Sequence, residues 1–173
     1  MDRDFYFIPM KKTKAILDNL NYPLLSIVFT ATVLCFSLFF AILFSILEID
    51  VMNNTQFDEL TPIALFFGAV IFAPIIETLI FQFAVIEIGL RVRENSTELK
   101  IHWFIPGLLS ALLFGLAHQY NWNYTLVTFL MGVILAVMYY YTRKRFGVSL
   151  AFLMCVLVHG FNNLVAFFFQ ISS

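Results

Sequence analysis

The chain has 173 residues, of which 61% are hydrophobic and only 12% are charged, with a formal net charge of −1. A soluble globular domain is typically about 45–50% apolar and about 25% charged. The composition therefore predicts an integral membrane protein, and the length suits one bundle of a few helices. The balanced charge, without a basic face, argues against a nucleic-acid partner.

The N-terminal part is predicted to contain a surface segment and one membrane span. Residues 1–23 combine lysines with apolar residues, which is typical either of a short helix on the cytoplasmic membrane surface or of a frayed tail. Residues 24–47 contain no charged residue and are long enough to cross the ~30 Å hydrocarbon core. Together with an acidic outer loop, this first helix occupies residues 24–61, and residues 62–170 are predicted to form the functional core.

Four more spans are predicted within that core. They lie at about 62–86, 101–118, 124–141 and 148–170. A charged loop at 87–100 separates the first two, and a short connection at 119–123 separates the next two. The predicted fold class is therefore all-α, a polytopic membrane bundle of about five transmembrane helices.

Positive charge is distributed unevenly between the predicted loops. Nearly all Lys and Arg residues lie in three segments, at 1–23, 87–100 and 143–145, whereas 48–61 and 119–123 contain none. Because cytoplasmic loops carry an excess of Lys and Arg, we expect the N-terminus in the cytoplasm and the C-terminus outside. Aromatic residues expected at the cytoplasmic edge are Trp103, Tyr139, Tyr140 and Tyr141, and Trp122 is expected at the outer edge.

The second span contains a carboxylate, Glu77, about 15 residues from its start. An acidic residue at the centre of a membrane helix costs about 2.5–3.5 kcal/mol on translocon scales, so it is a functional-site hypothesis by default. The structural alternative is a glutamate bonded to a neighbouring helix. Pro74 lacks an N–H and frees a backbone carbonyl. Thr78 and Gln82 are four residues apart and share a helix face beside Glu77.

Two other spans carry polar residues at helical spacing. Phe114 and His118 form a Phe-x-x-x-His pair at the end of the third span, which also has small residues at every fourth position. His159 and Asn163 lie one turn apart in the last span. Each pair alone is also typical of an interfacial or interhelical hydrogen bond. Their occurrence on three spans predicts one site inside the membrane.

One carboxylate and two imidazoles can activate water. Glu77 could accept a proton from water and return it to a leaving amine, with His118 orienting the same water. His159 and Asn163 could donate hydrogen bonds to the oxyanion of a tetrahedral intermediate. Glu77, His118 and His159 could alternatively hold Zn²⁺. The sequence contains no His-Glu-x-x-His motif, and no metal is expected.

The order of these motifs resembles that of the CAAX-protease and bacteriocin-processing (CPBP) family of intramembrane proteases. The motifs are Glu77-Thr78-x-x-x-Gln82, Phe114-x-x-x-His118 and His159-x-x-x-Asn163. The resemblance covers roughly residues 62–170. It implies that Glu77 and His118 activate water without a metal, that His159 and Asn163 form the oxyanion site, and that Phe114 supports them.

The first motif departs from that family's usual Glu-Glu-x-x-x-Arg. Thr78 replaces the second Glu and Gln82 replaces the Arg. A neutral hydrogen bond between Thr78 and Gln82 would substitute for the ion pair and support the site. The same changes are equally consistent with a branch of reduced activity.

The function predicted from these residues is an intramembrane endopeptidase of a bacterial plasma membrane. Its partners would be membrane lipids and a peptide or protein substrate at the membrane. One alternative is a catalytically weakened immunity or scaffold protein of the same family. Another is a small proton-coupled carrier that uses Glu77 and the histidines as a relay, although no inverted repeat is visible.

The depth of the predicted site in the membrane poses a geometric problem. His118 is predicted near the outer end of its span, whereas Glu77 is about 16 residues, or ~24 Å at 1.5 Å per residue, from Thr61. The two side chains can meet if the second span begins deeper than Pro62. They can also meet if residues 119–123 dip into the bilayer.

Overall fold

The computed structural model describes residues 17–49, 60–95 and 104–172. Every regular element in these ranges is a helix, in the order α2 (Tyr22–Ile46), α3 (Pro62–Leu65), η2 (Phe66–Phe72), α4 (Ala73–Glu77), η3 (Thr78–Val85), α5 (Ile86–Asn95), α6 (Phe104–Ala117), α7 (Trp122–Phe146) and α8 (Val148–Ser172). The elements from α3 to α5 follow one another without a break, and we call Pro62–Asn95 the long helix. Within it, η2 and η3 are π-helical. The predicted all-α fold class is confirmed.

Four helices of the described residues are long and apolar enough to cross a membrane: Tyr22–Ile46, Pro62–Val92, Trp122–Phe146 and Val148–Ile171. The fifth apolar helix, α6, is shorter and spans about 21 Å at 1.5 Å per residue. The bundle of about five membrane helices is thus confirmed. Three other expectations lie outside the described residues: the surface helix before residue 17, the acidic loop at 50–59 and the position of Trp103.

The loop predicted at 87–100 is wrong over its first part, because helix α5 continues through Asn95. The long helix does not end at Ile86 but includes the charged segment 87–95 as its last part. Similarly, Arg143, Lys144 and Arg145 lie in the last turn of α7 and not in a turn after it. At the end of α7, Arg143 and Arg145 find hydrogen-bond partners in other segments of the bundle.

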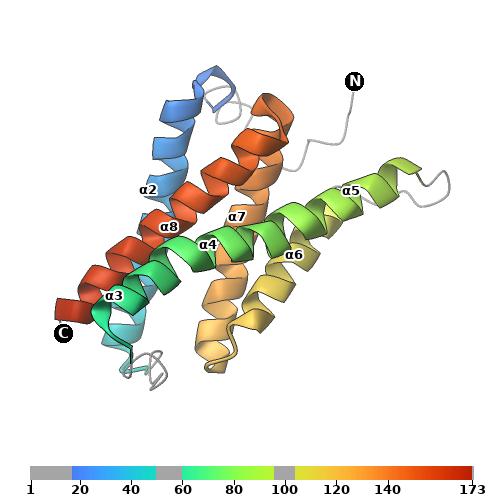
Figure 1. The fold of residues 1–173 in the computed structure, drawn as a ribbon. Coiled ribbons are helices and arrows are strands. Elements are labelled where there is room, and N and C mark those ends of the chain that lie inside the picture. Colours follow the sequence, from blue (N-terminus) through green and yellow to red (C-terminus); the bar gives the residue numbers. More distant parts are fainter. Residues whose placement is uncertain (1–16, 50–59, 96–103, 173) are drawn as a thin grey trace.

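Polar caps and one glycine determine where the helices begin and end. Asn21, Thr61 and Asn121 each precede a helix, and each side chain accepts a hydrogen bond from the backbone N–H three residues later. Gly147 alone separates α7 from α8 and has a φ of +91°, a conformation that favours glycine. This single residue reverses the chain, so α7 and α8 form a tight hairpin (Figure 1).

Helix α6 packs closely against α7 through small residues. A Cβ atom added at Gly132 would lie 2.9 Å from the Ala111 Cα, and one added at Gly115 would lie 2.7 Å from the Phe129 Cβ. Ala111 is fully buried. The small residues at every fourth position of α6 therefore allow the close approach of α7, as their spacing predicted.

The two arginines at the end of α7 join it to two other segments of the chain. The Arg143 guanidinium forms a bidentate pair with Glu87 at 2.5 and 3.0 Å. Arg145 donates to the backbone carbonyls of Leu17, Asp18 and Leu20. The end of α7, the start of α5 and the residues just before α2 thus lie together, which is compatible with a single cytoplasmic face. Which side of the membrane that end faces stays a prediction.

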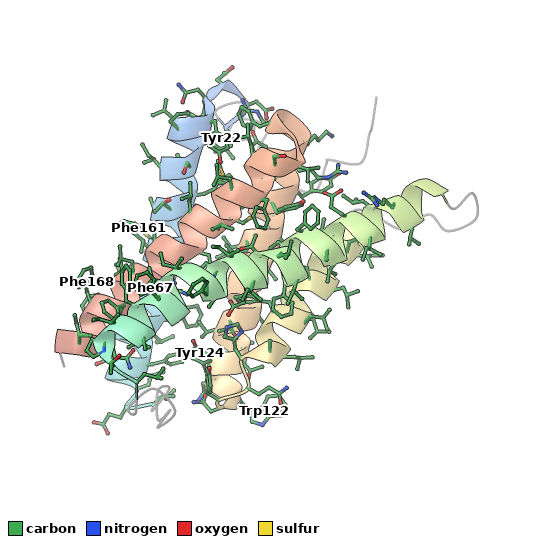
Figure 2. All side chains as sticks on the ribbon, in the orientation of Figure 1. Tyr22, Phe67, Trp122, Tyr124, Phe161 and Phe168 are labelled. Atoms are coloured by element: carbon green, nitrogen blue, oxygen red, sulfur yellow. The ribbon has the colours of Figure 1, made fainter. Side chains whose placement is uncertain are left out.

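The aromatic residues predicted at the cytoplasmic edge are instead largely internal. Tyr139 is 0% exposed and donates to Glu87, and Tyr141 is 6% exposed and donates to Asp18. Their hydroxyls find partners inside the bundle, so they need no water interface. Trp122 is 85% exposed, at the other end of the bundle from Tyr22, as an interfacial residue should be (Figure 2).

The long helix follows an oblique path through the bundle, which the sequence did not indicate. Its apolar part, Pro62–Val92, has 31 residues, about 47 Å of helix for a hydrocarbon core of ~30 Å. It runs obliquely across α7 and α8 (Figure 1). A tilted helix advances less than 1.5 Å in depth per residue. In the structure Glu77 lies beside His118, which directly follows the short α6 helix.

Candidate active site

Glu77 is the last residue of α4, the short α-helical turn between the two π-helical stretches. Its side chain is 22% exposed, but Oε2 is buried and has no hydrogen-bond partner among the described residues. π-helical segments are rare and are found frequently at functional sites. The local backbone and the orphaned oxygen both mark this residue as unusual.

His118 directly follows the last residue of α6. Its Nδ1 lies 2.7 Å from the Phe114 carbonyl oxygen, which can only accept a hydrogen bond, so Nδ1 carries the proton. This bond turns Nε2 toward Glu77 Oε2, at 3.7 Å. The His118 carbonyl in turn accepts bonds from the Tyr120 N–H and the Thr125 hydroxyl. Both the ring and the backbone of His118 are therefore fixed.

His159 approaches the same oxygen from α8. Its Nε2 lies 3.6 Å from Glu77 Oε2, and its side chain is 7% exposed. Nδ1 is buried and has no hydrogen-bond partner in the described part of the chain. The two imidazoles, from helices far apart in the sequence, thus present their Nε2 atoms to one carboxylate oxygen.

Phe114 holds the two imidazoles in place. Its ring centroid lies 4.6 Å from that of His118 and 5.6 Å from that of His159. Phe81, from η3, packs edge-on against it at 5.7 Å. Phe114 is 2% exposed, so this aromatic contact is internal to the bundle. The residue that the sequence suggested as a support lies between both histidines.

Glu77, His118 and His159 are also of the residue types that bind Zn²⁺. No group of three or more His, Cys, Asp or Glu side chains in the described residues could hold a metal ion. We therefore derive no step through Zn²⁺ or any other metal, and the chemistry considered below uses only the side chains of this chain.

Asn163 lies one turn beyond His159 but makes a different contact. Its amide Nδ2 donates to the backbone carbonyl of Ala69, at 2.9 Å. Its neighbour Asn162 accepts a hydrogen bond from Ser37 at 2.7 Å, which ties α8 to α2. Of the four residues predicted to form the site, His118 and His159 approach one oxygen of Glu77. The fourth, Asn163, contacts the helix that carries Glu77.

Thr78 and Gln82 are both 0% exposed but do not form the hydrogen bond expected between them. The Thr78 hydroxyl and both polar atoms of the Gln82 amide have no partner among the described residues. The hydroxyl of Ser110, on α6, is also buried without a partner there. Ser110 was missed from the sequence because a lone serine in an apolar helix carries no specific signal.

Tyr124 also lies near the site, and the sequence analysis did not identify it. Its ring centroid lies 6.1 Å from that of His118. Asn121, which caps α7, accepts a hydrogen bond from the Tyr124 N–H and so fixes this first turn. The sequence does show a capping residue, Asn121, followed by the aromatic Tyr124 shortly after His118. Only the geometry of the turn, however, brings the Tyr124 ring back to His118.

A protein-family model matches the part of the chain that contains the candidate site. The family model described as type II CAAX prenyl endopeptidase, Rce1-like, matches residues 59–165, more than half of the chain. This range contains Glu77, His118, His159 and Asn163. Searches of curated proteins and of solved structures gave no match.

Proposed function

Since the chain belongs to the Rce1-like family of type II CAAX prenyl endopeptidases, we propose that it is an intramembrane endopeptidase whose water is activated by Glu77. The observation that supports this most strongly is the approach of two imidazole Nε2 atoms to one carboxylate oxygen, at 3.6 and 3.7 Å. These distances exceed a direct hydrogen bond of about 2.7–3.2 Å. In the proposal, one water molecule bridges the three atoms.

In the proposed reaction Glu77 takes a proton from this water as the water oxygen attacks the scissile carbonyl carbon. His118, with its proton on Nδ1, offers an Nε2 lone pair that orients the water. A proton on His159 Nε2 and the second amide hydrogen of Asn163 are the donors proposed for the oxyanion. Glu77 then returns its proton to the leaving amine as the C–N bond breaks. The substrate would be a peptide or protein segment held at the membrane.

The test is cleavage of a panel of quenched-fluorescent, prenylated CAAX peptides by the purified, detergent-solubilised protein. We expect Glu77→Gln to lower turnover by about 10²–10⁴-fold, because the amide cannot accept the proton. Glu48→Gln, at an exposed residue beyond α2, is the matched control and should cleave as the wild type does. Turnover of the Glu77→Gln variant within about tenfold of the wild type would refute Glu77 as the base.

A second candidate function is favoured by one specific observation. Thr78 and Gln82 occupy the positions of the Glu and Arg in the family's usual first motif, and neither side chain has a polar partner in the described residues. A non-enzymatic immunity or scaffold protein would keep the fold without requiring those groups. In that case Glu77→Gln would preserve the cellular phenotype, and the wild-type protein would cleave no peptide of the panel.

A further inference from the structure

The contact of Asn163 occurs where the backbone hydrogen bonding of the long helix is interrupted. At the end of η2 the Ala73 N–H donates to the Gly68 carbonyl, five residues earlier. In this register the next acceptor is the Ala69 carbonyl, and its donor would be the N–H of residue 74. Residue 74 is a proline and has no N–H.

The Asn163 amide supplies the missing donor. Its Nδ2 lies 2.9 Å from the Ala69 carbonyl oxygen, within the range of a good hydrogen bond. A carbonyl left unpaired inside a membrane costs several kcal/mol, because no water is available to bond it. The side chain of one helix thus completes the backbone ladder of another.

The surrounding residues bring α8 close to this interruption. A Cβ atom at Gly160 would lie 3.1 Å from the Val70 carbonyl oxygen and within 4 Å of the Pro74 ring. Gly160 directly follows His159, and Pro74 lies three residues before Glu77. The same few residues of α8 therefore carry His159 and contact the turn that carries Glu77.

We propose that Asn163 is a positioning residue: its amide replaces the N–H missing from Pro74 and sets α8 against the long helix, which fixes the distance between His159 and Glu77. This role adds to the oxyanion donor proposed above, since the amide has two hydrogens and uses one on Ala69. The activity arm of its test rests on the proposed function, whereas the structural arm does not.

The test is a double-mutant cycle with Asn163→Ala, Pro74→Ala and both together. Alanine at position 74 restores a backbone N–H that can bond the Ala69 carbonyl from within the helix. We expect Asn163→Ala to lower turnover by more than about 10²-fold, since the variant loses the oxyanion donor and also displaces the reacting groups. Alanine at position 74 can restore only the second part. The double variant should regain at least about tenfold over Asn163→Ala, a strong non-additivity between two neighbouring sites. Asn162→Ala, which removes only the Ser37 contact, is the matched control.

Hydrogen–deuterium exchange of residues 66–77 provides the arm that is independent of catalysis. Exchange there should rise in Asn163→Ala and return toward the wild-type level in the double variant, even if no peptide is cleaved. If Asn163→Ala does not fold, recovery of a folded double variant supports the proposal. Additive losses of turnover, unchanged exchange in Asn163→Ala, or a double variant as defective as Asn163→Ala would overturn it.

Discussion

Thr78 and Gln82 show how individual residues of this site differ from those of an ordinary membrane helix. Both are fully buried next to Glu77, and their polar atoms have no partner among the described residues. A buried polar group without a partner costs about 1–3 kcal/mol, whereas an apolar group of the same shape does not. These residues therefore lower stability rather than contribute to it.

Replacing them by Thr78→Val and Gln82→Met should leave the free energy of unfolding unchanged or raise it by about 1–3 kcal/mol. The measurement is the thermal midpoint in detergent. Thr128→Val is the control, because the Thr128 hydroxyl is also buried but donates to the Tyr124 and Thr125 carbonyls. It should lose about 0.5–1.5 kcal/mol. A lower midpoint for the double variant would mean that Thr78 and Gln82 bind something that stabilises the fold.

At the scale of elements, the site depends on how closely α6 approaches α7. Gly132 faces the backbone of Ala111, and a Cβ atom there would also lie 3.2 Å from the Phe114 ring. Phe114 contacts both imidazoles. The close crossing of α6 and α7 therefore controls the position of the Phe114 ring beside the two histidines. Of the proposed catalytic residues, only His118 comes from this part of the chain.

Gly132→Ala should cost about 1–3 kcal/mol, because the new methyl group must push two helix backbones apart. Turnover should fall with it, because Phe114 shifts. Gly107→Ala is the matched control, since its Cβ would lie 3.6 Å from that of Ala136, an ordinary contact. That variant should be as stable as the wild type or gain up to about 1 kcal/mol of helix propensity. Thermal midpoints and turnover of the two variants check this, and equal effects of both would contradict it.

At the scale of the whole molecule, a charged cluster joins the end of the long helix to α7. Glu87 is 7% exposed and accepts hydrogen bonds from Arg143 and from the Tyr139 hydroxyl. The cluster lies ten residues beyond Glu77 on the same helix. It holds the far end of the long helix, while contacts with α8 hold the end near η2, so the oblique path across the bundle is fixed at two places.

Arg143→Met should lower the free energy of unfolding by about 3–5 kcal/mol, because Glu87 would be left buried without its counter-ion. Adding Glu87→Gln should recover most of that loss, since no buried charge then remains. Lys144→Met, at the exposed neighbour, should change stability by no more than about 0.5 kcal/mol. Chemical denaturation of the wild type, Arg143→Met, Glu87→Gln and the double variant measures the coupling. A double variant no more stable than Arg143→Met would contradict the pairing.

The sequence by itself determined the membrane-helix fold and indicated three side chains that the structure brings together. Long apolar runs define α2, α7 and α8, because a helix is the simplest structure that pairs its own backbone groups in lipid. Glu77, His118 and His159 were recognisable because ionisable groups are energetically costly in such runs. A residue of this kind is therefore a functional-site hypothesis by default.

Only the tertiary structure decided how these residues meet. The tilt of the long helix and the burial of Tyr139 depend on contacts between segments distant in the sequence, such as those of Glu87 with Tyr139 and Arg143. The bond from Asn163 to the Ala69 carbonyl depends on a π-helical register that no local pattern predicts. Hydropathy specifies that a segment lies in the membrane, whereas depth, tilt and side-chain partners follow from packing against neighbouring helices.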